Sequence, residues 1–431
     1  MTETKPSEAG HYSGRGWHLI AYERLRNAPE WLAAPITAAG LVIITLVVML
    51  LIVRSFGALL GGSADDVYKL LLSLAGAIGA PFIAWRTIVA HQQTVIAREN
   101  HYTTLFTKAL ELLGSTREVI SNGEAGSQSR VTEPNLELRF GAVYALERVA
   151  ADSERDHWPI MEVLCAYVRN PQNCGTPSYR SDDKDTAAPC GWDHYPGSTR
   201  VDVQAALTVI GARPEHRKMF ERAKKCRLNL TSANLQRAKL AGDLSVADFG
   251  GANMELARFE ECKLDGVIFW CSLSGSNFSR SSLGGCEFVD EQVLKGIRFS
   301  RCDFHRAVFS SARFSQCTFM NSKLKECHWD SATLTDVRFL NCDLSDTDLD
   351  DVEFVRGSLS GCVLARTSLF GADLHNVRGL ASNRIDTCLG DKTTILPDGI
   401  ARPNHWPDHE IDLAARSAWK DRVRQLQMIK M

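Results

Sequence analysis

The sequence predicts a multidomain protein in which a two-helix transmembrane hairpin, a small α-helical adaptor and a square parallel β-solenoid follow one another. Three observations carry this prediction. Residues 31–53 contain no charged side chain, a second apolar stretch follows at 70–85, and large apolar residues recur at every fifth position through much of the C-terminal half. A chain of 431 residues has room for two or three domains, so a modular organisation is expected.

The charge composition argues against nucleic acid as a partner but does not identify another partner. The formal net charge is −2, and 23% of the residues are charged. Such a chain has no overall basic field for binding phosphates and no strong acidic field for imitating them. A nucleic-acid partner is therefore not expected.

The cysteines and the N-terminus point to a reducing compartment. Of thirteen cysteines, eight recur at one fixed phase of the repeat, where a thiol serves as a small apolar group. Residues 1–34 carry cations among acids and prolines, with no short apolar core followed by a cleavage site. We expect reduced thiols and a cytoplasmic N-terminal segment.

Residues 35–86 are predicted to form the transmembrane hairpin. Its first span, 35–53, is dominated by Val, Ile and Leu and is long enough for roughly 30 Å of hydrocarbon. The second, 70–86, is shorter than ideal and is bracketed by Lys69 and Arg86, which can snorkel. Cations outside the hairpin outnumber those near its tip, which places both termini inside the cell. A buried helical pair in a soluble domain is the alternative.

Residues 87–114 are predicted to form a stalk helix. Apolar residues at heptad spacing, such as Val95 and Tyr102, allow a homo-oligomer, although His91 and Arg98 interrupt the second apolar row. The polar stretch 115–134 is expected to be a linker.

Residues 136–213 are predicted to form an α-helical adaptor that contains a loop at 170–200. The expected helices are Leu136 to Ala150, Pro159 to Val168, and Val201 to Ile210, the last ended by Gly211 and Pro214.

Two groups in this region invite a chemical interpretation. Ser153, Asp156 and His157 fall within five residues, but members of a catalytic triad meet through the fold, and Ser153 with Asp156 is also a capping box. A zinc site is the second interpretation, at Cys174, Cys190 and His194, but their spacing matches no paired-cysteine pattern. We expect no catalytic residue, cofactor or metal.

The five-residue periodicity is the strongest signal. From Phe299 to Leu374, sixteen successive fifth residues are Phe, Leu or Trp, and a small or β-branched residue precedes each by two positions. This period fits neither a 3.6-residue helix nor a two-residue strand. It fits a square coil with one side per repeat, whose large and small residues both face the axis.

This pattern resembles the bacterial pentapeptide-repeat family, which implies a right-handed quadrilateral parallel β-helix over residues 226–390. The segments LRFGAVYALERVAADSERDHWPIMEVLCAYVR (138–169) and DVQAALTVIG (202–211) resemble the region before the repeats in one subgroup. The resemblance implies a fold but no catalytic residues. Register slips near residues 243–244, 271–273 and 291–294 predict bulges.

Residues twenty apart should stack on successive coils. Cys302, Ser322, Cys342 and Cys362 would form one column, with Cys342 and Cys362 about 4.8 Å apart. A disulfide or a metal site is one interpretation of this column, and thiols that fill space are the other. Trp329 is larger than its neighbours and is expected to distort its coil.

Charges segregate along the array and mark a possible partner surface. An acidic level comprises Asp343, Asp346, Asp348, Asp350, Asp351 and Glu353. A basic level comprises Arg298, Arg301, Arg306 and Arg313. A charge run is also commonly just a solvated face.

Residues 391–431 are expected to close the array, because a β-helix end leaves unpaired backbone edges and exposed core. The segment 395–406 looks like the closing segment of related proteins, and residues 408–428 are predicted to form a charged amphipathic helix.

Three functions follow. The favoured one is a non-enzymatic scaffold, tethered to the bacterial inner membrane with its repeats in the cytoplasm, whose partners are the lipid bilayer and an unknown protein. A membrane effector whose hairpin oligomerises and perturbs the bilayer is the alternative. The resemblance also implies a DNA-mimicking gyrase binder, which is disfavoured because residues 224–390 hold twenty Lys and Arg against twenty-one Asp and Glu.

Overall fold

A computed structural model describes residues 49, 50, 52–54, 56, 64–122, 128–170, 199–289, 293–418 and 420. The chain divides into two compact units, residues 1–100 and 101–431. The first unit contributes most of α3 (Ala64–Leu113), a continuous helix of 50 residues.

The predicted hairpin is not supported by the described helices. None of the helices in the described ranges combines the length and the apolar character needed to cross a membrane. The second predicted span, 70–86, and the predicted stalk are parts of the one helix α3, and Lys69 and Arg86 flank an apolar stretch of only sixteen residues. The first predicted span, 35–53, lies almost entirely outside the described residues.

In the second unit, the end of α3 is followed by a β-hairpin where a linker was predicted, so that prediction was wrong. Strands β1 (Thr116–Asn122) and β2 (Gln128–Pro134) pair antiparallel, with Val119 opposite Val131. Thr and Val in both segments, with Ile120 in the first, favour strands, and cross-strand Arg130 lies 3.8 Å from Glu118. The polar character of the segment had concealed this alternation.

Four helices follow the hairpin. They are α4 (Leu136–Asp152), α5 (Glu154–Arg169), α6 (Val201–Gly211) and α7 (Glu215–Lys224). Asn135 caps α4 by accepting from the Leu138 N–H, and Leu146, Ile160 and Leu164 are fully buried between the helices. Helix α7 was not predicted, because its surface is almost entirely polar.

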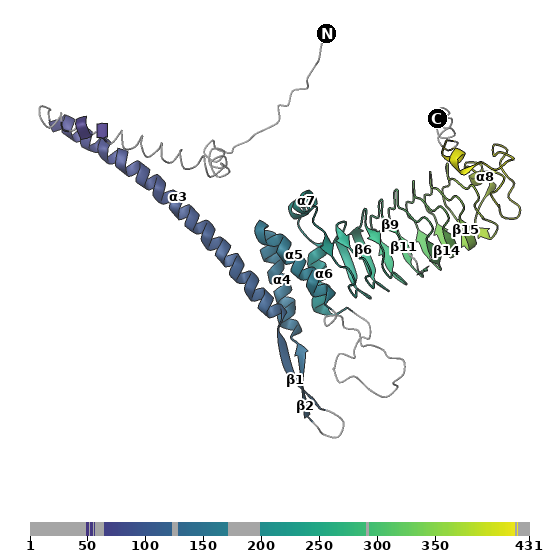
Figure 1. Ribbon diagram of the computed structural model, residues 1–431, viewed down its shortest axis with the longest axis horizontal. Coiled ribbons are helices and arrows are strands. Elements are labelled where there is room, and N and C mark those ends of the chain that lie inside the picture. The colour runs from purple at the N-terminus through teal and green to yellow at the C-terminus, as the bar shows by residue number, and fades with distance from the viewer. Residues whose placement is uncertain are drawn as a thin grey trace, which may run out of the picture. The chain divides into compact units, whose positions relative to one another are not determined.

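The repeats form a β-solenoid of short parallel strands, seen in Figure 1 as a stack running from β6 to β15. The strands are β3 (Leu228–Asn229), β4 (Lys239–Asp243), β5 (Ala247–Asp248), β6 (Arg258–Lys263), β7 (Ile268–Phe269), β8 (Asn277–Ser279), β9 (Glu287–Phe288), β10 (Leu294–Lys295), β11 (Arg298–Ser300), β12 (Arg313–Ser315), β13 (Thr318–Met320), β14 (Thr333–Leu340), β15 (Glu353–Ser358) and β16 (Val377–Arg378). The predicted β-solenoid is thus present, with all its described ladders parallel.

The centre of each repeat faces inward, as predicted. Phe299, Phe319 and Phe339 are fully buried and stack on successive coils, with ring centroids 4.6 and 4.9 Å apart. Trp329 is also fully buried, 4.0 Å from the Phe309 ring. The expectation that it distorts its coil was wrong, because the twenty-residue register is kept on both sides of it.

The slips predicted from the sequence change the length of individual coils. Lys239 pairs with Arg258, Arg258 with Asn277, and Asn277 with Arg298, so the register advances by 19, 19 and 21 residues before it settles at twenty. One irregularity lies between Ala241 and Gly242. The buried column is kept across these changes, because Phe259, Phe278 and Phe299 stay fully buried and stacked.

The thiols in the small position are hydrogen-bond donors. Cys327 Sγ donates to the Phe304 carbonyl at 3.0 Å, and Thr367 Oγ1 fills the same role toward Leu344 at 2.9 Å. Cys342 and Cys362 are free thiols that donate to carbonyls of the preceding coil. Burial raises the pKa of Cys302 to about 11. These observations favour space-filling thiols over a disulfide or a metal site.

Both ends of the solenoid are closed. At the start, α6 approaches β4 so closely that a Cβ added to Gly242 would lie 2.2 Å from the Gly211 carbonyl oxygen. The far end carries α8 (Ser382–Ile385) and the buried Trp406, whose Nε1 donates to the Cys388 carbonyl at 2.9 Å. Trp406 therefore serves in the cap, which shields the exposed backbone edge.

Candidate interaction surface

Ser153 and its neighbours play structural roles. Ser153 is the N-cap of α5, accepting from the Asp156 N–H at 3.2 Å and donating to the Asp156 carboxylate at 2.8 Å. The His157 ring points elsewhere, with Nε2 2.7 Å from Glu221. The predicted N-cap is thus present, but the reciprocal bond of a capping box is not, because the Ser153 N–H donates to the Val149 carbonyl. Cys174, Cys190 and His194 lie outside the described residues.

A buried ionic hub joins the adaptor to the solenoid. Glu221 on α7 contacts His157 at 2.7 Å and the Arg213 guanidinium at 2.9 Å, and all three side chains are 1% exposed. Arg213 also donates to the Asp243 carbonyl at 3.0 Å. Because every member is paired, the hub fixes the first coil against the helices.

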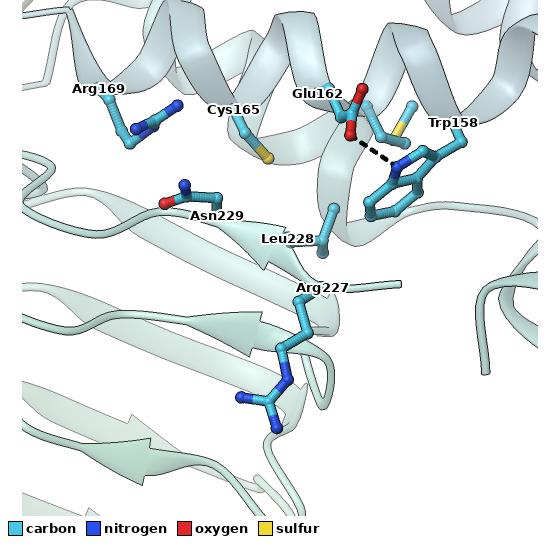
Figure 2. A pocket seen from close by; sticks show the side chains of 8 residues that line it. Trp158, Glu162, Cys165, Arg169, Arg227, Leu228 and Asn229 are labelled. Carbon is cyan, nitrogen blue, oxygen red and sulfur yellow. Dashed lines mark hydrogen bonds between the residues drawn. The ribbon is translucent and has the colours of Figure 1, made fainter. Parts of the chain in front are cut away.

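A small cleft of about 180 Å³ lies between α5 and β3 (Figure 2). It is lined by Trp158, Met161, Glu162, Cys165, Arg169, Arg227, Leu228 and Asn229. Glu162 accepts from the Trp158 indole at 2.9 Å, and burial raises the pKa of the Cys165 thiol to about 12. The Cys165 thiol is therefore protonated at neutral pH and is not an activated nucleophile.

The predicted basic residues do not gather into one patch. Arg298 and Arg313 precede the buried Phe299 and Phe314, which lie on different sides of the same coil, and Arg301 and Arg306 occupy corners between them. All four are exposed, and Arg306 pairs with Glu326 of the next coil at 2.8 Å. Since one coil takes about twenty residues, a run of sixteen encircles the solenoid.

The predicted acidic residues are dispersed in the same way, with one exception. Asp343 pairs with Lys325 at 3.3 Å and Asp346 with Arg366 at 2.6 Å, each across one coil. Glu353 is exposed on another side, where it begins β15. Only Asp348 and Asp350 share one side of the solenoid, which is called face C below, and Asp351 occupies the corner next to it.

Face C is one outer side of the solenoid. On each coil it is formed by the two residues that flank, in the chain, the buried residue of one internal column. The column comprises Phe269, Phe288, Phe309, Trp329, Leu349 and Leu369. The outer residues before it are Ile268, Glu287, Val308, His328, Asp348 and Ser368, which are paired in this order by parallel bridges. The outer residues after it are Trp270, Val289, Ser310, Asp330, Asp350 and Phe370.

The C-terminal segment lies along the late part of face C. Residues 411–418 and Lys420, here called the latch, include a helical stretch at 413–418. Lys420 Nζ donates to Asp348 and to Asp350 at 2.7 Å each, and Arg416 donates to Asp351 at 2.7 Å. The latch thus pairs with all three acids, of which Asp350 is buried while the Asp351 side chain stays 45% exposed.

An apolar contact accompanies these ion pairs. Ile411 packs with Phe370 and Leu389 in a cluster separate from the main core, and Arg416 lies over the Phe370 ring at 5.7 Å from its centroid. The Ile411 N–H donates to Asp391 at 2.8 Å. Phe370 points outward, so its burial depends on the latch.

Asp350 is the most perturbed acid of this surface. Burial and the neighbouring Asp348 charge raise its pKa to about 6, although Lys420 opposes the shift. Its carboxylate also accepts from Ser368 Oγ and from the Phe370 N–H at 3.2 Å. The site therefore holds a carboxylate that is costly to charge and that needs a cation beside it.

The early part of face C carries uncovered apolar side chains. Trp270 is 64% exposed, Ile268 53% and Val289 41%. Trp270 and Val289 directly follow the paired residues Phe269 and Phe288, so they sit on adjacent coils.

Four residues of this surface were not predicted from the sequence: Trp270, Phe370, Arg416 and Lys420. For the two aromatic residues the detectable signal was a large apolar side chain just after a buried centre, where polar residues are usual. Arg416 and Lys420 carry no such signal, because they lie beyond the repeats and reach face C only through the fold.

Comparison with known proteins concerns the repeats. Residues 292–369 match the model of the pentapeptide repeat region, and residues 227–270 match that of pentapeptide repeats (8 copies). A search of curated proteins finds no sequence relative.

Several solved structures are similar to part of the chain. HetL from the cyanobacterium Nostoc sp. strain PCC 7120, a protein involved in heterocyst differentiation regulation, is 19% identical, with 43% of this chain and 92% of HetL covered at a TM-score of 0.20. QnrB1, a plasmid-mediated fluoroquinolone resistance protein, is 17% identical, with 45% and 87% covered at a TM-score of 0.22. The two matched segments, 227–270 and 292–369, identify the β-solenoid of this chain as a pentapeptide-repeat domain.

Proposed function

We propose that the protein is a non-enzymatic interaction scaffold that binds a protein partner on face C. The observation that carries this proposal is the exposure of Trp270, 64%, beside Ile268 and Val289 on the outer side of a rigid β-solenoid. Tryptophan is enriched among residues that dominate binding energy, and clustered exposed apolar residues mark interaction sites.

The surrounding surface supports a specific rather than a general adhesive role. Elsewhere on the solenoid, opposite charges meet from one coil to the next, as in Arg280 with Glu261 at 2.9 Å and Arg356 with Asp336 at 2.9 Å. Because acidic residues alternate with cations in these pairs, the described coils carry no continuous acidic strip of the kind that a DNA mimic needs. Face C combines an apolar end with an acidic end, which gives a partner both an anchor and an orientation.

Tethering to the bacterial inner membrane, with the repeats in the cytoplasm, is the second part of the proposal. It is supported by the sequence of residues 35–53, an uncharged run rich in Val, Ile and Leu. Fractionation of cells that express the full chain tests it. The chain should stay in the membrane pellet after a carbonate wash, and its release into the supernatant would contradict tethering.

A crosslinking pull-down with the full chain tests the binding surface. Wild type is compared with Trp270→Ala and with the control Val363→Ala, which removes a 52% exposed apolar side chain from a different side of the solenoid. We expect the Trp270 variant to lose at least tenfold of the captured partner and the Val363 variant to retain it. Equal capture by all three chains would exclude face C as the binding surface.

A further inference from the structure

We propose that the latch is a releasable intramolecular ligand, and that the surface beneath it is a docking site for a basic amphipathic segment of a partner protein. The segment it fits has an aliphatic residue followed five and nine positions later by Arg and Lys, as in Ile411, Arg416 and Lys420. This inference rests on the proposed function in taking face C as the partner-binding side.

The first support is that the latch is not the cap. The end of the solenoid is closed by Trp406, which is 4% exposed and donates to Cys388, and by Ile385, which is fully buried. From Ile411 onward the chain instead runs back along the outside. Its contacts step from Asp391 to Phe370 and then to Asp350, which lie on three successive coils.

The second support is that the contacts of the latch are those of a ligand rather than of a core. Among the described residues its apolar cluster has three members, Phe370, Leu389 and Ile411, and is separate from the continuous core of the solenoid and adaptor. The other contacts are polar and lie at the side of a finished β-surface. They are two ion pairs from Lys420, one ion pair and a ring contact from Arg416, and one backbone hydrogen bond from Ile411 to Asp391. Such a contact is removable without unfolding the coils beneath it.

The third support is the chemistry that would be exposed on release. Asp348 and Asp350 both contact Lys420 and would repel one another without it, Asp351 would lose Arg416, and Phe370 would lose the contacts of Ile411 and Arg416. This combination of three carboxylates beside an aromatic ring selects a cationic, partly aliphatic segment. A guanidinium can pair with a carboxylate and stack on the ring at once, as Arg416 does.

Binding of a labelled peptide to the full chain tests the proposal. The probe is a peptide of residues 409–424, and its control carries Glu at the positions of Arg416 and Lys420. We expect wild type to bind the probe weakly, because its own latch competes at high effective concentration. The full chain carrying Arg416→Ala with Lys420→Ala should bind it at least tenfold more tightly, and Asp348→Asn with Asp350→Asn added should remove this binding.

A second variant keeps the test independent of folding. Lys420→Ala alone removes the contacts to Asp348 and Asp350 and leaves the Arg416 stack in place, so it should bind the probe with intermediate affinity. Hydrogen exchange should rise in residues 411–418 of both variants while the Phe299 to Phe339 coils stay protected. Equal probe binding by wild type and both latch variants, or no binding by either variant, would overturn the proposal. Failure here with Trp270-dependent capture intact rejects the latch alone, whereas loss of that dependence rejects the proposed function.

Discussion

Asp350 and Lys420, seventy residues apart in the chain, meet at 2.7 Å on the outer side of the solenoid. Lys420 also contacts Asp348 at the same distance, so one cation serves two carboxylates. The pair links the non-repeating C-terminal segment to the late coils of the repeat array. The stability of this contact depends on pH, because Asp350 is buried and its pKa is raised.

Replacing Asp350 should remove a pH dependence of stability. The folded-state pKa of Asp350 is raised to about 6, so the native protein binds this proton more tightly than the unfolded chain does. The stabilisation is therefore present in acid and is lost as the pH rises through 6. Relative to Asp350→Asn, wild type should gain roughly 1–2 kcal/mol of unfolding free energy between pH 7 and pH 5.

Urea denaturation at several pH values measures this difference. Asp330→Asn is the matched control, because Asp330 holds the equivalent position one coil earlier, where Ser310 Oγ donates to it at 2.6 Å. The control should follow the wild-type pH profile. A profile of Asp350→Asn that runs parallel to wild type would contradict the assignment.

Adding a methyl group at Gly242 should disrupt the contact between α6 and the first coil. Gly242 has a φ of +81°, and an added Cβ would lie 2.2 Å from the Gly211 oxygen. Gly266 is the control, since its φ is +72° but nothing lies within 4 Å of an added Cβ. We expect Gly266→Ala to cost about 1 kcal/mol and Gly242→Ala more than about 3 kcal/mol in thermal or urea unfolding. Equal losses would show that φ alone matters.

Removing Glu221 should strongly destabilise the junction. Glu221→Ala leaves His157 and Arg213 buried without their shared partner, which costs roughly 3–5 kcal/mol. Glu215→Ala on the same helix removes only contacts to Lys218 and Arg222 from a 59% exposed side chain, and should cost less than about 0.5 kcal/mol. Urea unfolding separates the two, and similar losses would argue against the hub.

Trp329 should tolerate replacement by phenylalanine but not by alanine. Its ring stacks on Phe309, while its buried Nε1 has no hydrogen-bond partner among the described residues. Trp329→Phe keeps the stack and removes the unpaired donor, so stability should change by less than about 1 kcal/mol. Trp329→Ala leaves a cavity and should cost about 3–5 kcal/mol. A loss as large for Phe as for Ala would imply a role for the indole beyond packing.

The amount of the fold that the sequence predicted differs between segments. The β1–β2 hairpin was missed because its alternation is short and its residues are polar, and α7 because its stability comes from the Glu221 hub rather than from an apolar stripe. The Ser153 cap was predictable, since a cap depends on residues three apart. The first membrane span, residues 35–53, remains a prediction from the sequence.

By itself, the sequence determined the solenoid. Each of the sixteen repeats has the same local pattern, which predicts the residues that face the axis and those that stack. Tertiary structure alone decided which charged residues become neighbours. One coil turns a run such as Arg298 to Arg313 around the whole solenoid. The fold also brings Lys420 to Asp348 and Asp350, and Arg416 to Asp351. The latch lies outside the repeat pattern, because its contacts join a unique segment to coils up to 72 residues away, and no local spacing encodes such a pairing.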